Sequence, residues 1–171
     1  MSIQGFLEIQ LSDRCMETLA YRARFGRGDD GGITITFPEI PFAISGTFNE
    51  DEAEAMARDC LDEAIASLVA RNEPLPRPKP ARKGERMIAV PAVTAAKALL
   101  NAAVRERNVT QRQLADRLKV DQKEVRRMLD PHSRATKIGR LEEALATFGI
   151  TVAMCVPGES LEWEPENRRA R

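Results

Sequence analysis

The sequence predicts an α+β protein with two parts, a small sheet covered by one helix and then a helical domain that ends in a strand. Three observations predict this fold class. Apolar and polar side chains alternate in short runs over residues 19–47, which is typical of strands with one solvated face. Apolar side chains recur at steps of three and four over residues 53–68, as in an amphipathic helix. A proline-rich, basic stretch at residues 74–84 then precedes a region of mostly helical patterning.

Three strands are expected in the first part. Residues 19–25 alternate apolar and charged side chains, and residues 33–37 alternate again and are rich in β-branched side chains. The glycine- and aspartate-rich residues 26–32 between them predict a hairpin with a long turn. After two prolines, residues 42–47 predict a third, short strand.

A helix is expected to cover this sheet. Asn49 is a suitable N-cap, and acidic side chains within residues 50–54 fill the first turn, where the helix dipole favours them. The apolar stripe of residues 53–68 faces the sheet, and Pro74 ends the helical region. Residues 87–90 form a short apolar run that can return to the sheet as a last strand.

These elements predict the domain organisation. The spacer holds four prolines and four basic side chains between residues 74 and 84, which leaves it few options for packing. The predicted divisions are an N-terminal extension at 1–18, a sheet-and-helix domain at 19–73, a linker at 74–86, a returning strand at 87–91, a helical domain at 92–156 and a disordered tail at 157–171.

The formal net charge of zero hides an uneven distribution along the chain. Residues 1–72 hold 6 basic and 13 acidic side chains, a net charge of −7. Residues 73–107 (8 basic, 3 acidic) and 108–140 (9 basic, 4 acidic) each carry +5, and residues 141–171 (3 basic, 6 acidic) carry −3. An acidic first half and a basic centre indicate two partners, a basic protein and a polyanion. Ordinary surface charge is the alternative.

Cysteine usage and hydropathy argue against several classes of protein. Cys15, Cys60 and Cys155 are widely spaced and odd in number, which predicts neither a disulfide framework nor a metal site and fits a reducing cytoplasm. The single histidine, His132, cannot by itself form a metal site or a catalytic triad. No apolar run approaches the ~20 residues of a membrane helix, and the N-terminus lacks a secretory signal pattern. We expect a cytoplasmic protein that is not an enzyme and has no cofactor, metal or membrane partner.

The second region contains two predicted short helices joined by a tight turn. Thr110 can cap the first helix, with Gln113 completing a capping box, and Asp121 can cap the second. Ala115 is small enough to let the helices cross closely, and Val120 can fill the space between them. This order is typical of the helix-turn-helix motif of DNA-binding proteins. A generic helical hairpin with a solvated polar face is the alternative.

Predicted DNA contacts come from three places. The second helix presents polar and basic side chains that can bond base edges or phosphates. The N-terminus of the first helix can hold a phosphate, and a basic loop leads into a last helix at residues 137–148, capped by Thr136. The predicted DNA-binding residues are Thr110, Gln111, Gln122, Lys123, Arg126, Arg127, Thr136 and Lys137.

Residues 150–156 alternate as one strand at the end of the helical domain, after Gly149. Because a lone strand cannot satisfy its own backbone groups, it needs a partner, and a second copy of the chain is the economical one. We therefore expect a homodimer or a higher even oligomer, with Ile150, Val152 and Met154 at the dimer interface.

The chain resembles the HicB antitoxin family over roughly residues 17–156. The resemblance is carried by residues 21–23, the Gly31-Gly32 turn, residues 37–41 (Phe-Pro-Glu-Ile-Pro), Gly46, the acidic residues 50–54, and, in the second half, residues 88–91, 110–111, 114–115 and 135–138. It implies a first domain with a truncated RNase H-like sheet that binds and blocks HicA, a small basic mRNA interferase. It further implies a second domain that binds operator DNA as a dimer and represses the shared operon.

Within the first domain we predict a toxin-binding site at Phe37, Glu39 and Ile40, from their place beside the hairpin. Two other functions are possible alternatives. The carboxylates of Asp29, Asp30 and Glu39 raise the question of a Mg²⁺-dependent nuclease, although two of them lie in a glycine-rich turn. The other alternative is a stand-alone transcription regulator whose first domain senses a small molecule.

Overall fold

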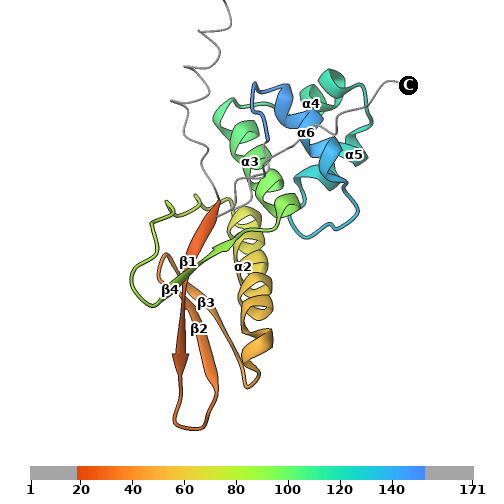
Figure 1. Cartoon of the computed structure of the whole chain (residues 1–171). Helices are drawn as coiled ribbons and strands as arrows, with labels where there is room; N and C mark the ends of the chain where they lie inside the picture. Colours follow the sequence, from red (N-terminus) through yellow and green to blue (C-terminus); the bar gives the residue numbers. More distant parts are fainter. Residues whose placement is uncertain (1–18, 153–171) are drawn as a thin grey trace, which may run out of the picture.

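The computed structural model describes residues 19–152 as an antiparallel sheet and a set of helices (Figure 1). The fold is α+β, as predicted. The elements in chain order are β1 (Ala20–Arg27), β2 (Ile33–Phe37), β3 (Ile40–Thr47), the short 3-10 helix η1 (Glu50–Glu52), α2 (Ala53–Ala70), β4 (Glu85–Ala89), α3 (Ala92–Glu106), α4 (Gln111–Leu118), α5 (Gln122–Leu129) and α6 (Ile138–Ala146).

The sheet has four strands in the order β3-β2-β1-β4, and every neighbouring pair is antiparallel. The predicted hairpin joins β1 and β2, and Gly31 in its turn has a φ of +80°, a backbone conformation that glycine adopts without strain. Strand β3 begins at Ile40, two residues earlier than predicted. The reason is a two-residue turn across which Phe37 pairs with Ile40, so Pro38 and Glu39 lie in the turn.

Helix α2 covers one face of the sheet (Figure 1). The Asn49 side chain accepts a hydrogen bond from the Asp51 N–H at 3.0 Å, but it caps η1 and not α2, whose own N-cap, Glu52, makes no side-chain cap hydrogen bond. The helix buries Ala57, Leu61 and Ile65 against apolar side chains of the strands.

The last strand returns to the sheet after the spacer. Strand β4 pairs with β1, with Tyr21 opposite Ile88, and it begins at Glu85, inside the predicted linker of residues 74–86. The spacer also packs more than expected, because Leu75 contacts the sheet core and the carbonyl of Pro76 accepts a 2.9 Å hydrogen bond from the Tyr21 hydroxyl. The linker is therefore shorter and partly attached to the sheet.

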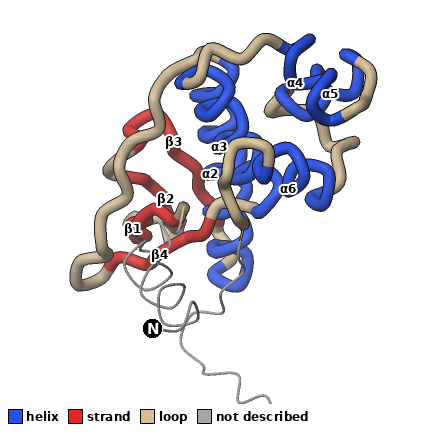
Figure 2. Tube along the Cα trace, turned by 90° about the horizontal axis from the view of Figure 1, so that it is seen from above, coloured by secondary structure: helices blue, strands red, loops and turns tan. Residues whose placement is uncertain are grey.

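The helices α3 to α6 enclose a second core. Leu100 of α3, Leu114 of α4, Val125 of α5 and Leu141 of α6 are all fully buried in it. Helix α3 contributes to both cores, because Ala98 packs in the sheet core while Ala96 and Leu100 pack in the helical core. Figure 2 shows α2 and α3 between the sheet and the other helices.

The described part of the predicted terminal strand is not a strand. Residues 150–152 form no regular element, and Ile150 and Val152 pack against the helical core of the same chain. Helix α6 ends two residues before its predicted end, and Gly149 has the expected left-handed φ, +71°. The rest of the predicted strand, with Met154, lies outside the described residues, so the dimer interface stays a prediction.

Candidate nucleic-acid interface

The start of α4 has the capping box that the sequence predicted. The Thr110 hydroxyl accepts a hydrogen bond from the Gln113 N–H at 3.2 Å, and the Gln113 side-chain oxygen accepts one from the Thr110 N–H at 2.8 Å. This reciprocal pair satisfies two backbone donors that a helix N-terminus otherwise leaves free. Gln111 follows in the first turn and is exposed.

A tight turn joins α4 to α5. Lys119 takes the left-handed conformation, with φ 54° and ψ 44°, and the Val120 N–H donates to the Ala115 carbonyl at 3.1 Å. Ala115 is 3% exposed, and Val120 packs on the helical core. Both residues hold the places the sequence predicted for them.

Helix α5 is capped by Asp121, whose carboxylate accepts a hydrogen bond from the Glu124 N–H at 2.7 Å. The Glu124 carboxylate turns away from the cap and pairs with Arg140 of α6 at 2.8 Å. The predicted Asp121 cap is therefore present without a reciprocal bond from Glu124, whose carboxylate instead forms a contact between α5 and α6.

The two faces of α5 differ sharply. Val125 and Met128 are buried against the helical core. The polar and basic side chains predicted to contact DNA are all exposed: Gln122, Lys123, Arg126 and Arg127. Within residues 19–152, this cationic face is therefore uncovered.

The loop after α5 differs in detail from the prediction. Thr136 does not cap α6, because the N-cap is Lys137 and it makes no side-chain cap hydrogen bond. The Thr136 hydroxyl instead donates to the Arg127 carbonyl at 3.1 Å, at the C-terminal end of α5. Lys137 is exposed. His132, also exposed, lies 3.6 Å from the Glu63 carboxylate of α2.

Sequence reasoning missed two side chains of α3 that hold the C-terminal end of α5. The Lys97 ammonium is 1% exposed and donates to the carbonyls of Asp130 at 2.6 Å, Arg127 at 3.4 Å and Ser133. The Asn101 amide donates to the Leu129 carbonyl at 3.0 Å. Burial lowers the pKa of Lys97, and the Asp130 carboxylate opposes that shift. The sequence feature that could have indicated this role is a single lysine in a helix otherwise rich in alanine and leucine.

The predicted toxin-binding residues are not on the surface. Phe37 and Ile40 are each 1% exposed and belong to the sheet core. The side chain of Glu39 is 3% exposed and pairs with Arg22 at 2.6 Å. All three shape the end of the sheet, and little of their side chains is accessible to a partner.

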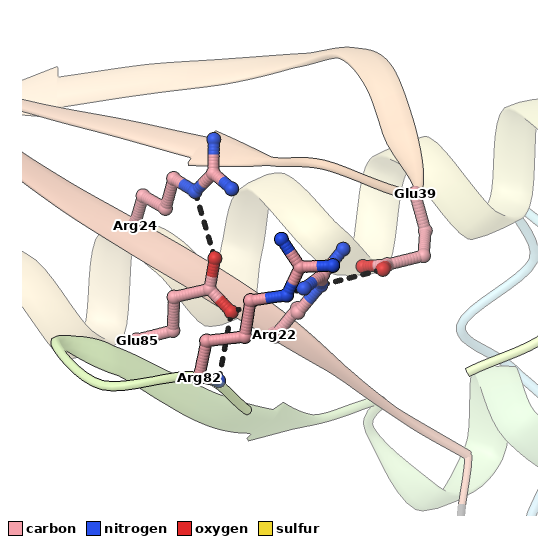
Figure 3. A network of polar contacts seen from close by, with 5 residues as sticks. All are labelled: Arg22, Arg24, Glu39, Arg82 and Glu85. Carbon is pink, nitrogen blue, oxygen red and sulfur yellow. Dashed lines mark hydrogen bonds and ion pairs between the residues drawn. The ribbon is translucent and has the colours of Figure 1, made fainter. Parts of the chain in front are cut away.

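Arg22 is the centre of a buried polar network (Figure 3). It also reaches the Glu85 carboxylate at 3.3 Å, and Glu85 in turn accepts hydrogen bonds from Arg24 at 2.7 Å and from the Arg82 N–H at 2.9 Å. The Arg82 N–H and the Arg24 guanidinium hold the pKa of Glu85 below its ordinary value.

Tyr21 and the second carboxylate oxygen of Glu39 are buried beside this network. Burial, with the Glu39 carboxylate nearby, raises the pKa of Tyr21 to about 12. The second carboxylate oxygen of Glu39 is buried with no hydrogen-bond partner. A carboxylate already paired with Arg22 is poorly suited to bind Mg²⁺, and within residues 19–152 no group of three or more potential metal ligands gathers.

The sheet part does expose apolar side chains at its β3 edge. Phe42 is 51% exposed, Ile44 is 61% exposed and Phe48, just after the strand, is 78% exposed. A groove lined by Phe42, Ile44 and Glu63, among others, runs between β3 and α2. The exposed side of α2 carries three acidic side chains, Glu54, Asp59 and Glu63, and one basic side chain, Arg58. The Arg71 guanidinium, just after the helix, lies over the Phe42 ring at 5.0 Å.

Comparison with known proteins defines the class to which this chain belongs. The model of the HicB-like antitoxins of bacterial toxin–antitoxin systems matches residues 20–99, which hold the sheet, α2 and the first half of α3. An antitoxin is therefore the class that the sheet part indicates. No helix within residues 19–152 has the length and apolar character needed to cross a bilayer.

Similar curated proteins extend this match. Antitoxin HicB of Escherichia coli is 35% identical over 127 residues, which cover 73% of this chain and 90% of that protein. Antitoxins HicB 2 and HicB 1 of Photorhabdus laumondii are 32% and 31% identical and cover 78% and 75% of this chain, and 93% and 81% of their own lengths. The chain belongs to the HicB family of antitoxins. Alignments of this length necessarily reach beyond residue 99 into the helical part.

Proposed function

We propose that this antitoxin represses its own operon by binding operator DNA through α4 and α5, which act as a helix-turn-helix. The observation that carries the proposal is the cationic face of α5, where Gln122, Lys123, Arg126 and Arg127 are all exposed. Glutamine and arginine side chains on a helix of this kind can form bidentate hydrogen bonds to adenine and guanine in the major groove. Exposed Thr110, Gln111 and Lys137 lie near helix ends and suit phosphate contacts.

We further propose that the sheet part is a truncated RNase H-like unit without nuclease activity, and that it neutralises a HicA-type mRNA interferase. The relatives carry the name antitoxin, which fits a regulatory protein rather than an enzyme. We place the toxin contact at the exposed Phe42 and Ile44 of β3 beside the acidic side chains of α2. Apolar side chains with acidic neighbours fit a cationic protein surface.

Repression also requires two copies of the DNA-binding unit on a symmetric operator. We propose that residues 150–156 pair with the same segment of a second chain. Ile150 and Val152 then serve both the helical core and the interface, because each already packs on the core of its own chain.

One experiment tests both activities. The chain is co-expressed with the product of the neighbouring gene, and growth is scored together with repression of a reporter placed behind the upstream DNA. The double variant Arg126→Ala, Arg127→Ala should lose repression and keep growth rescue. Its control is Arg77→Ala, Lys79→Ala in the exposed spacer, which should keep both.

The toxin contact has its own variants. Phe42→Asp and Ile44→Asp should lose growth rescue and keep repression, whereas Met87→Asp, at an exposed apolar position on the opposite edge strand, should keep both. Loss of both activities in the α5 variant would contradict the division of labour between the two parts. Full repression by that variant would contradict the assignment of α5.

A further inference from the structure

Helix α5 spans only eight residues, Gln122–Leu129, so its placement depends on contacts outside itself. A helix leaves its last four carbonyls without helical partners. In α5, the Arg126 carbonyl accepts from the Asp130 N–H at 2.9 Å, and the Leu129 carbonyl accepts from Asn101 at 3.0 Å. The end of this helix is therefore tied to α3 by side chains.

Lys97 is the principal tie. Its ammonium is buried and lies among the carbonyl oxygens of Arg127, Asp130 and Ser133, which belong to the last turn of α5 and to the loop that follows. Carbonyls at a helix C-terminus carry partial negative charge, so a cation there is favourable. The lysine has three donors, and three carbonyls accept from it.

We propose that Lys97, assisted by Asn101, is a positioning residue that sets the orientation of α5 and thereby the DNA sequence preference of the protein without touching DNA. The inference rests on the proposed function of α5. Because the loop from Asp130 to Ser133 is held by the same ammonium, the path toward Lys137 is set together with the helix. When Lys97 is changed, the exposed cationic face of α5 keeps its charge, but the helix no longer holds its orientation.

Lys97→Met tests this role, because methionine is similar in length and has no donor. The first measurement is amide hydrogen exchange along the full chain without DNA. Exchange should become faster in α5 and residues 130–137, with no change in α2 or the strands. Lys83→Met, at an exposed lysine of the spacer, is the matched control and should leave the pattern unchanged.

The second measurement compares binding to a duplex with the upstream sequence and binding to a scrambled duplex at one salt concentration. One misplaced bidentate base contact lowers specific affinity by about tenfold or more, so the ratio of the two affinities should fall by about that factor. Binding to the scrambled duplex depends on phosphate charge and should change by less than about twofold. A lysine that only stabilises the fold would instead weaken both interactions equally.

Several results would overturn the inference. An affinity ratio for Lys97→Met within twofold of the wild type is one, and unchanged exchange in α5 is another. If Lys97→Met does not fold, Asn101→Ala decides, because it removes the hydrogen bonds to the Leu129 and Lys97 carbonyls, leaves the Lys97 ammonium in place, and should give the same pattern at smaller size. A wild-type chain with no preference for the upstream duplex would refute the proposed function itself, before any variant is compared.

Discussion

The buried pair of Arg22 and Glu39 offers the most informative test of how the sheet is stabilised. Their side chains are 6% and 3% exposed, and they meet at 2.6 Å. Removing one partner of a buried ion pair typically costs about 3–5 kcal/mol, because the other charge stays buried. We expect Arg22→Met to lower the free energy of unfolding by about that amount, a large share of the ~5–15 kcal/mol of a typical domain, because it leaves the Glu39 carboxylate buried without its partner. Glu39→Met should cost less, because Arg22 keeps the Glu85 carboxylate at 3.3 Å.

The double variant Arg22→Met, Glu39→Met should recover most of this loss. Glu85 does not become a new orphan in it, because Arg24 and the Arg82 N–H still donate to its carboxylate at 2.7 Å and 2.9 Å. Replacing a whole buried pair by packed apolar side chains is often neutral. Urea unfolding of the four chains, with the slope checked for constancy, measures the coupling. A double variant as unstable as the sum of the single variants would refute this reasoning.

Four further predictions follow from the contacts. Thr110→Ala should lower the free energy of unfolding by about 1 kcal/mol through loss of the capping box, as measured by thermal unfolding. Gln111→Ala, at a neighbouring residue that takes no part in the cap, is the comparison. Because the pKa of Glu85 is lowered in the folded chain, its stabilising contribution is present above about pH 4.3 and is lost as the pH falls through its lower folded value. Glu85→Gln should therefore make the free energy of unfolding depend less steeply on pH between roughly pH 5 and 3. An unchanged slope would contradict the contribution of Glu85. Deletion of residues 150–156 should weaken dimerisation in sedimentation experiments, and a deletion chain that stays dimeric would remove this segment from the interface. Ala115→Leu should force α4 and α5 apart at a cost of about 1–3 kcal/mol, and should also weaken binding to the upstream DNA.

Features that depend on neighbouring residues could be predicted from the sequence. Asn49, Thr110 and Asp121 cap helices through donors two or three residues away, so the local pattern was sufficient. The same holds for the β1–β2 hairpin, whose glycine-rich turn lies between two alternating runs. The spacing of the apolar residues in α5 was also sufficient to predict that its basic face is exposed.

Features that depend on distant partners could not be predicted. Lys97 finds its acceptors 30 to 36 residues away, and Arg22 finds its two carboxylates 17 and 63 residues away. The burial of Phe37 and Ile40 was not predicted for a related reason. The prolines on either side of Glu39 suggested a break in the chain, whereas a two-residue turn keeps both apolar side chains in register and inside the core.

The return of β4 to the sheet determines how the protein behaves when it is cut into two fragments at the spacer. Strand β4 ends at Ala89 and α3 begins at Ala92, so the strand belongs by position to the segment that carries the helices (Figure 1). A fragment that stops at the spacer loses one edge of its sheet, and the complementary fragment carries an unpaired strand. We expect a protease cut between residues 77 and 83 to leave both pieces bound to each other, separable only under denaturing conditions.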